Sequence, residues 1–183
     1  DALVTAWSEI GLGRMSEALA ALDALAARPG MAGFAAYHKA LALASVGDFE
    51  GAAGLLSGEA AGPLRLTRRG VIGFAQILSQ LERQADALEL LDEAFAGGSD
   101  PTIAALRVAL SAGRAVPFTL VREATDGLAE VFYTVALALQ GEAADSFTLL
   151  YSRTAEALRP DHVDAVLLSA RNRSLSFCFI LYL

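Results

Sequence analysis

The sequence of 183 residues is poor in the residue types that mark several functional classes. It has one cysteine, Cys178, so no disulfide can form within the chain. Lysine and arginine number 14 against 21 aspartates and glutamates, which gives a formal net charge of −7. This balance disfavours nucleic acid and anionic membranes as partners, because both select basic surfaces. No apolar run reaches the roughly 18 residues that suggest a membrane-spanning helix.

Proline is also scarce, and each of the five prolines lies where a turn is expected. The chain is rich in alanine and leucine, which head the helix-propensity scale, and has few β-branched runs before its last residues. The prolines therefore separate helices rather than kink them. These features predict an all-α protein.

A short motif recurs at a nearly constant spacing. Residues 13–18 (Gly-Arg-Met-Ser-Glu-Ala) return as residues 47–52 (Gly-Asp-Phe-Glu-Gly-Ala) 34 positions later, and less strictly as residues 82–87 after another 35. A period of this size is typical of stacked helix pairs, in which each repeat buries its apolar face against its neighbours. The sequence therefore predicts about five helical repeats.

The repeats resemble the tetratricopeptide repeat (TPR) family, whose unit is a 34-residue helix-turn-helix with small residues where helices approach closely. Alanine fills such positions in three repeats, at Ala40 and Ala52, Ala75 and Ala87, and Ala136 and Ala155. The resemblance covers about residues 1–171 and implies a right-handed α-solenoid of antiparallel helix pairs. The wording of residues 126–130 and 158–161 also looks like bacterial proteins of this family, which implies the bacterial cytoplasm or periplasm.

One repeat and the C-terminus depart from the pattern. The repeat over residues 101–126 is expected to be shortened by about seven residues, with a clear first helix at 102–112 and a stunted or irregular second helix from Pro117. Residues 172–183 form an atypical apolar tail with high β propensity. Two interpretations of the tail are open: a longer array cut at this point, or a hydrophobic hook for self-association.

No motif indicates catalysis, a cofactor or a metal, so the protein is not expected to be an enzyme. Asp161, His162 and Asp164 offer three metal ligands in four residues, but a helix N-cap and a first-turn carboxylate explain the two aspartates better. His38 is expected to be partly exposed on a helix beside the groove. An acidic stripe on one helix is expected to face solvent: Glu82, Asp86, Glu89 and Glu93.

In the tetratricopeptide family, fixed positions of the first helix of each repeat line a concave groove. The resemblance places nine residues there: Phe34, Tyr37, Leu41, Arg69, Ile72, Gln76, Arg107, Tyr133 and Leu137. It implies an interaction scaffold that binds a peptide or helical segment of another protein. Two alternatives stay open. The tyrosines Tyr37 and Tyr133 could serve only to pack against the next helix, and the protein could be a self-associating module that uses its C-terminal helix or tail.

Overall fold

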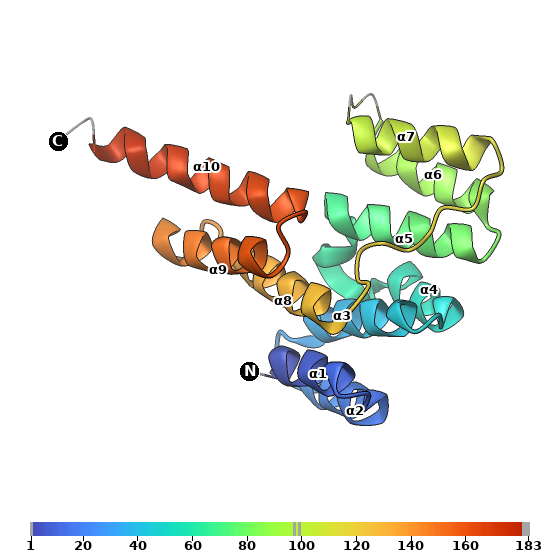
Figure 1. Cartoon of the computed structure of the whole chain (residues 1–183), viewed down its shortest axis with the longest axis horizontal. Helices are drawn as coiled ribbons and strands as arrows, with labels where there is room; N and C mark the ends of the chain where they lie inside the picture. Colours follow the sequence, from blue (N-terminus) through green and yellow to red (C-terminus); the bar gives the residue numbers. More distant parts are fainter. Residues whose placement is uncertain (1, 97, 99, 181–183) are drawn as a thin grey trace.

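The computed structural model describes residues 2–96, 98 and 100–180, with side chains as far as residue 172. The described chain is helical and contains no strand (Figure 1). The helices, in chain order, are α1 (Ala2–Gly11), α2 (Met15–Ala26), α3 (Ala32–Ser45), α4 (Phe49–Ser57), the 3-10 helix η1 (Glu59–Leu66), α5 (Arg68–Gln80), α6 (Gln84–Ala94), α7 (Pro101–Ser111), α8 (Ala124–Leu139), α9 (Asp145–Leu158) and α10 (Val163–Ile180).

Four helix hairpins, α1–α2, α3–α4, α5–α6 and α8–α9, form the body of the protein. The alanines at the expected small positions all have exposed fractions of 0%. They are Ala40 and Ala52, Ala75 and Ala87, and Ala136 and Ala155. Small side chains allow the backbones to approach closely, and larger apolar side chains fill the space beside them. The all-α prediction and the pairing of helices are thus confirmed.

The turns between paired helices share one backbone conformation. Gly13 and Gly47, the first residues of the recurring motif, have φ angles of 76° and 87°. Glu82 stands at the corresponding place of the third copy and also adopts a positive φ of 59°. A left-handed conformation is natural for glycine and unfavourable for glutamate, so the turn geometry persists even where the sequence match weakens.

From α1 to α7 the helices pack largely in sequence order, but α8 leaves that order. After α7 the chain runs in an extended path over residues 114–122, here called the strap, and α8 then packs against α1 and α3 (Figure 1). Gly127 on α8 makes this contact close, because a Cβ atom there would lie 2.0 Å from Cε3 of Trp7. A single stack running through residue 171 is therefore not confirmed.

The strap also corrects the expected second helix of the shortened repeat. The start of α7 at Pro101 agrees with the prediction, and Asp100 caps it by accepting hydrogen bonds from the backbone N–H groups of Thr102 and Ile103. No helix begins at Pro117, however. Proline lacks a backbone donor, and the backbone groups of Val116 and Thr119 bond to side chains of α5 instead of forming a helical turn.

The C-terminal helix α10 continues to Ile180, past the expected boundary at residue 172. The hydrophobic hook that the sequence suggested involves side chains after residue 172, which lie outside the described part. The sequence predicted that Asp161 is the N-cap of α10, and this prediction is wrong. Instead, Nδ1 of His162 accepts the backbone N–H of Ala165 at 3.1 Å, while Asp161 pairs with Arg159 at 2.9 Å.

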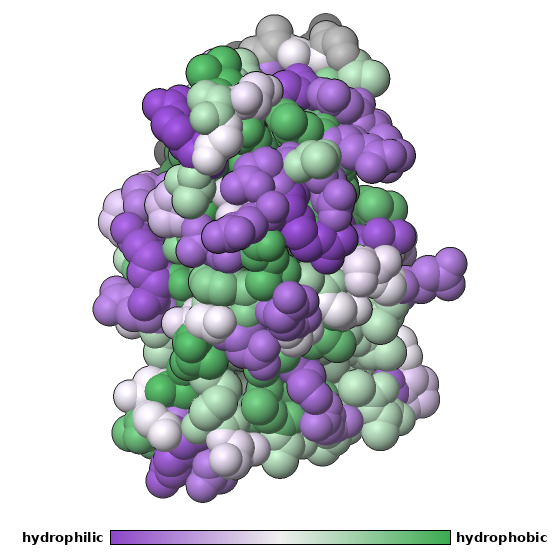
Figure 2. Space-filling model, turned by 90° about the vertical axis from the view of Figure 1, so that its right-hand side faces the viewer, coloured by the Kyte–Doolittle hydropathy of each residue, from purple (hydrophilic) through white to green (hydrophobic). Residues whose placement is uncertain are grey.

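Within the described part of the chain, no helix combines the length and apolar character needed to span a bilayer. The surface seen from the right-hand side of Figure 1 mixes hydrophilic side chains with smaller apolar patches (Figure 2). Three members of the predicted acidic stripe, Glu82, Glu89 and Glu93, are exposed, and the half-buried Asp86 pairs with Arg83 at 2.5 Å. A solvent-facing stripe was therefore a correct prediction.

Candidate functional site

The nine predicted groove residues fall into two groups. Six are buried: Tyr37, Leu41, Arg69, Ile72, Gln76 and Tyr133. Phe34, Arg107 and Leu137 are half-buried. Arg107 lies on α7 and pairs with Asp92 of α6 at 2.9 Å, so it contributes to helix packing there. The remaining residues come from α3, α5 and α8. The helices α3 and α8 are in direct contact, and the strap connects α5 to α8.

The strap covers the α5 side of the predicted groove. Gln76 accepts the backbone N–H of Thr119 at 2.9 Å and donates to the Thr119 hydroxyl at 3.0 Å. Ser79 accepts the N–H of Val116 at 2.8 Å, and Gln80 donates to the Val116 carbonyl at 2.7 Å. Three polar side chains on one face of α5 thus bond to backbone N–H and C=O groups of an extended segment. A neighbouring strand would satisfy the same groups in a β-sheet.

Apolar side chains fix the strap as well. Leu120 is buried, and its Cδ2 atom lies 2.5 Å from where a Cβ atom on Gly73 of α5 would stand. The ring of Phe118 meets that of Phe49 edge-on, with 6.5 Å between centroids. The α5 face is therefore built to receive a chain at this point, and its own chain fills it.

Arg69 joins the strap to α8. Its Nε atom donates to Oε1 of Glu130 at 2.5 Å, and its Nη2 atom donates to the carbonyl of Leu120 at 3.3 Å. Glu130 is fully buried, and Nε2 of His162 lies 3.2 Å from the same Oε1. Burial opposes ionisation of Glu130, but the Arg69 guanidinium and the His162 ring outweigh it and lower its pKa to about 2. The junction therefore holds a carboxylate.

A second buried polar chain crosses from α1 through α3 to α8. Nε1 of Trp7 donates to Nδ1 of His38 at 3.1 Å, so the neutral imidazole carries its proton on Nε2. That atom lies 3.1 Å from the hydroxyl of Thr134, which in turn donates to the carbonyl of Glu130 at 2.9 Å. The expectation that His38 is partly exposed is wrong: its exposed fraction is 0%, and burial lowers its pKa to about 4.

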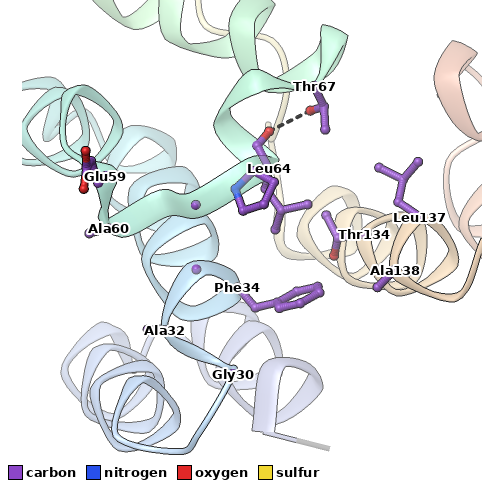
Figure 3. Close-up of a pocket in the computed structure, with 13 residues that line it drawn as sticks. Gly30, Ala32, Phe34, Glu59, Ala60, Leu64, Thr67, Thr134, Leu137 and Ala138 are labelled. Carbon is purple, nitrogen blue, oxygen red and sulfur yellow. Dashed lines mark hydrogen bonds between the residues drawn. The ribbon is translucent and has the colours of Figure 1, made fainter. Parts of the chain in front are cut away.

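An open apolar pocket of about 630 Å³ lies between the start of α3, η1 and the C-terminal half of α8 (Figure 3). Two predicted groove residues line it, Phe34 from α3 and Leu137 from α8, and the ring of Phe34 points toward α8. Leu64 and Pro63 of η1 form the facing wall. Pockets of 300–1,000 Å³ with mostly apolar walls are typical binding sites.

Polar groups in this pocket are few. Thr134 lines the pocket, and its hydroxyl belongs to the chain of hydrogen bonds that begins at Trp7. The Thr67 hydroxyl donates to the Leu64 carbonyl at 2.7 Å (Figure 3). Glu59, at the start of η1, is the one charged residue among those that line the pocket.

A second hollow, of about 450 Å³, lies between α8 and α10. Tyr133 and Leu137 line it, and Leu137 thus borders both hollows. Tyr37 is buried on α3, where its ring lies edge-on to the ring of the neighbouring His38, with 5.6 Å between centroids. Tyr133 is also buried but reaches the second hollow.

The described side chains contain no group of three or more histidines, cysteines or acids that could hold a metal ion. Both histidines are engaged in the buried networks described above. Sequence reasoning missed the strap as a groove occupant, although its Pro117 and β-branched neighbours marked it as a poor helix. It also missed Leu64, Pro63 and Glu59, because η1 interrupts the repeat pattern and carries no groove position.

Comparisons of the chain with protein-family models, curated proteins and solved structures gave no match.

Proposed function

We propose that the protein is an interaction scaffold of tetratricopeptide type that binds a peptide or helical segment of a partner protein. The binding site is the apolar pocket between α3, η1 and α8. In this proposal, the paired helices form a short right-handed solenoid, and the strap and α8 fill part of its concave side.

One observation carries the proposal: groove positions on α5 already bind an extended segment, the strap, while groove positions on α3 and α8 line an open apolar pocket. Gln76 holds the strap backbone through two hydrogen bonds. Phe34 and Leu137 border a volume of about 630 Å³ that no side chain of the described protein fills. Aromatic and aliphatic side chains that surround a hollow and exclude water are typical of sites that anchor a partner.

The test fills the pocket without touching the core. Ala138 is an exposed residue of α8 that lines the pocket (Figure 3), so an indole at this position would occupy the volume. Ala105 of α7 is equally exposed and lines no hollow described here, so Ala105→Trp is the matched control. Short random peptides would be selected on the 183-residue chain by display, and labelled synthetic copies would be titrated by fluorescence anisotropy.

We expect peptides to be selected and Ala138→Trp to weaken their binding by about tenfold or more, which corresponds to the loss of one buried anchor. Ala105→Trp should leave their affinity unchanged. Failure to select any peptide, or equal affinities for both variants, would show that this pocket is not a polypeptide-binding site.

A further inference from the structure

The chemistry at the rim of the pocket adds a constraint on the bound segment. Its walls are apolar, and Glu59 is the only charge that lines it. Glu59 stands at the start of η1, on the side of the pocket away from α8 (Figure 3). Its side chain is exposed and enters no ion pair among the described residues. A carboxylate in this place can accept a charge-assisted hydrogen bond from a partner at little desolvation cost.

We infer that the bound segment carries a large apolar anchor residue with a lysine or arginine close to it in sequence, so that the anchor enters the pocket and the cation meets Glu59. This inference rests on the proposed function and specifies the partner chemistry. It depends on charge complementarity: the protein has a formal net charge of −7, which also favours encounter with basic segments.

The strap shows how such a segment would be held on this molecule. It is extended, and the apolar side chains of Phe118 and Leu120 alternate with a polar residue, Thr119, whose backbone is bound. Its ends are basic, at Arg114 and Arg122. The α5 face thus holds the strap through its apolar side chains and its backbone, while the guanidinium of Arg122 pairs with Asp126 of α8 at 2.9 Å. The partner segment would likewise place an apolar side chain in the pocket and pair its cation with a carboxylate.

The experiment uses the peptides selected on the 183-residue chain and reverses the charge first on the protein and then on the peptide. Glu59→Lys should weaken binding by about fivefold, since an exposed ion pair is worth about 0.2–1 kcal/mol and reversal adds repulsion. Replacing the basic residue of the peptide by glutamate should weaken its binding to the natural protein and restore binding to Glu59→Lys. Glu89→Lys, an exposed charge reversal on α6, is the control and should have little effect.

The two proposals fail in different ways. Peptides that bind, respond to Ala138→Trp and yet show no basic enrichment and no response to Glu59→Lys would overturn this inference and leave the proposed function standing. Sedimentation of the protein without peptide tests whether a second copy of the chain occupies the pocket. A concentration-dependent dimer that Ala138→Trp dissolves would overturn the inference in favour of a second copy of the chain as the occupant.

Discussion

The faces of α5 and α8 that the sequence predicted to line one groove differ in what covers them: the strap lies on α5, whereas α8 borders an open pocket. On α5 the facing residues are Gln76, Ser79 and Gln80, whose side chains satisfy the backbone of the strap. Leu137 of α8, which the repeat resemblance aligns with Gln76, borders a pocket instead. Backbone N–H and C=O groups cannot be buried without partners, so polar residues at these positions admit an extended chain. Leu137, an apolar residue where α5 has Gln76, favours an apolar side chain as the occupant.

The two faces are joined by Arg69, which contacts both the strap and α8, and its removal should have the largest effect. Arg69→Met leaves the buried carboxylate of Glu130 without its guanidinium partner. Breaking a buried ion pair in this way costs about 3–5 kcal/mol. Urea unfolding should show this loss, with most of it recovered in Arg69→Met/Glu130→Gln. Arg83→Ala, which breaks an exposed pair with Asp86, should cost less than about 1 kcal/mol.

The helix α8, which forms one wall of the open pocket, lies close against α1, and Gly127 tests that contact. Gly127→Ala would push a methyl group into the ring of Trp7, at 2.0 Å from Cε3. Overpacking of this kind costs about 1–3 kcal/mol. Gly54→Ala is the control, since this exposed glycine of α4 has no heavy atom within 4 Å of its added Cβ. It should be stabilising by about 0.5–1 kcal/mol, and an equal response of both variants would contradict the close contact.

Acid should lower the free energy of unfolding through protonation of His38, which lies at the contact of α1, α3 and α8. Burial lowers the pKa of His38 to about 4 from an ordinary value of 6.5, so the unfolded chain binds a proton in a range where the folded chain does not. Stability is therefore lost as the pH falls from 6.5 towards 4, by about 2 kcal/mol between pH 7 and pH 5. Urea unfolding at several pH values should show this slope, and His38→Gln should remove it above pH 5.

Below that range Glu130 should dominate. Its pKa is lowered to about 2 in the folded protein, so the stability that its ionised form contributes is present above about 4.5 and is lost as the pH falls from 4.5 towards 2. The two groups thus act in successive windows, first at the α1–α3–α8 contact and then at the junction with the strap. A single transition centred near pH 4 in both the natural protein and His38→Gln would contradict this assignment.

Local features of the fold were accessible from the sequence because they depend on neighbouring residues. The Asp100-Pro101 signal fixed the start of α7, and the spacing of the alanines located the close contacts between paired helices. The shortened repeat was also visible, since its register cannot hold two full helices. Each of these predictions uses capping, propensity or period, which act within a few turns of the chain.

The features that make the candidate site were not accessible, because their partners lie far apart in sequence. His38 is buried by Trp7 and Thr134, which are 31 and 96 positions away. Gln76 was expected to line a groove, and in the structure it is buried beneath Thr119, which lies 43 positions further along the same chain. No periodicity in the sequence indicates that residues after α7 return across α5. The repeat pattern therefore predicts which residues line a groove, but not whether another part of the chain occupies it.

The smallest predicted effect on stability is that of Gln76→Ala, which tests directly why the strap covers the face of α5 and leaves that of α8 open. Gln76→Ala removes the acceptor of the Thr119 N–H and leaves the apolar anchors Phe118 and Leu120 in place. Because Thr119 is exposed, water can replace the lost partner, and the global cost should be only about 1 kcal/mol. Hydrogen exchange at the Thr119 amide should nevertheless quicken by about fivefold, since its protection depends on this bond.

Gln140 is an exposed residue directly after α8, where no strap is bound. Gln140→Ala removes the same kind of side chain and should leave hydrogen exchange at Thr119 unchanged. If neither substitution altered exchange there, the apolar anchors alone would hold the strap. The polar residues of α5 would then no longer explain why this face is filled and the α8 face is open.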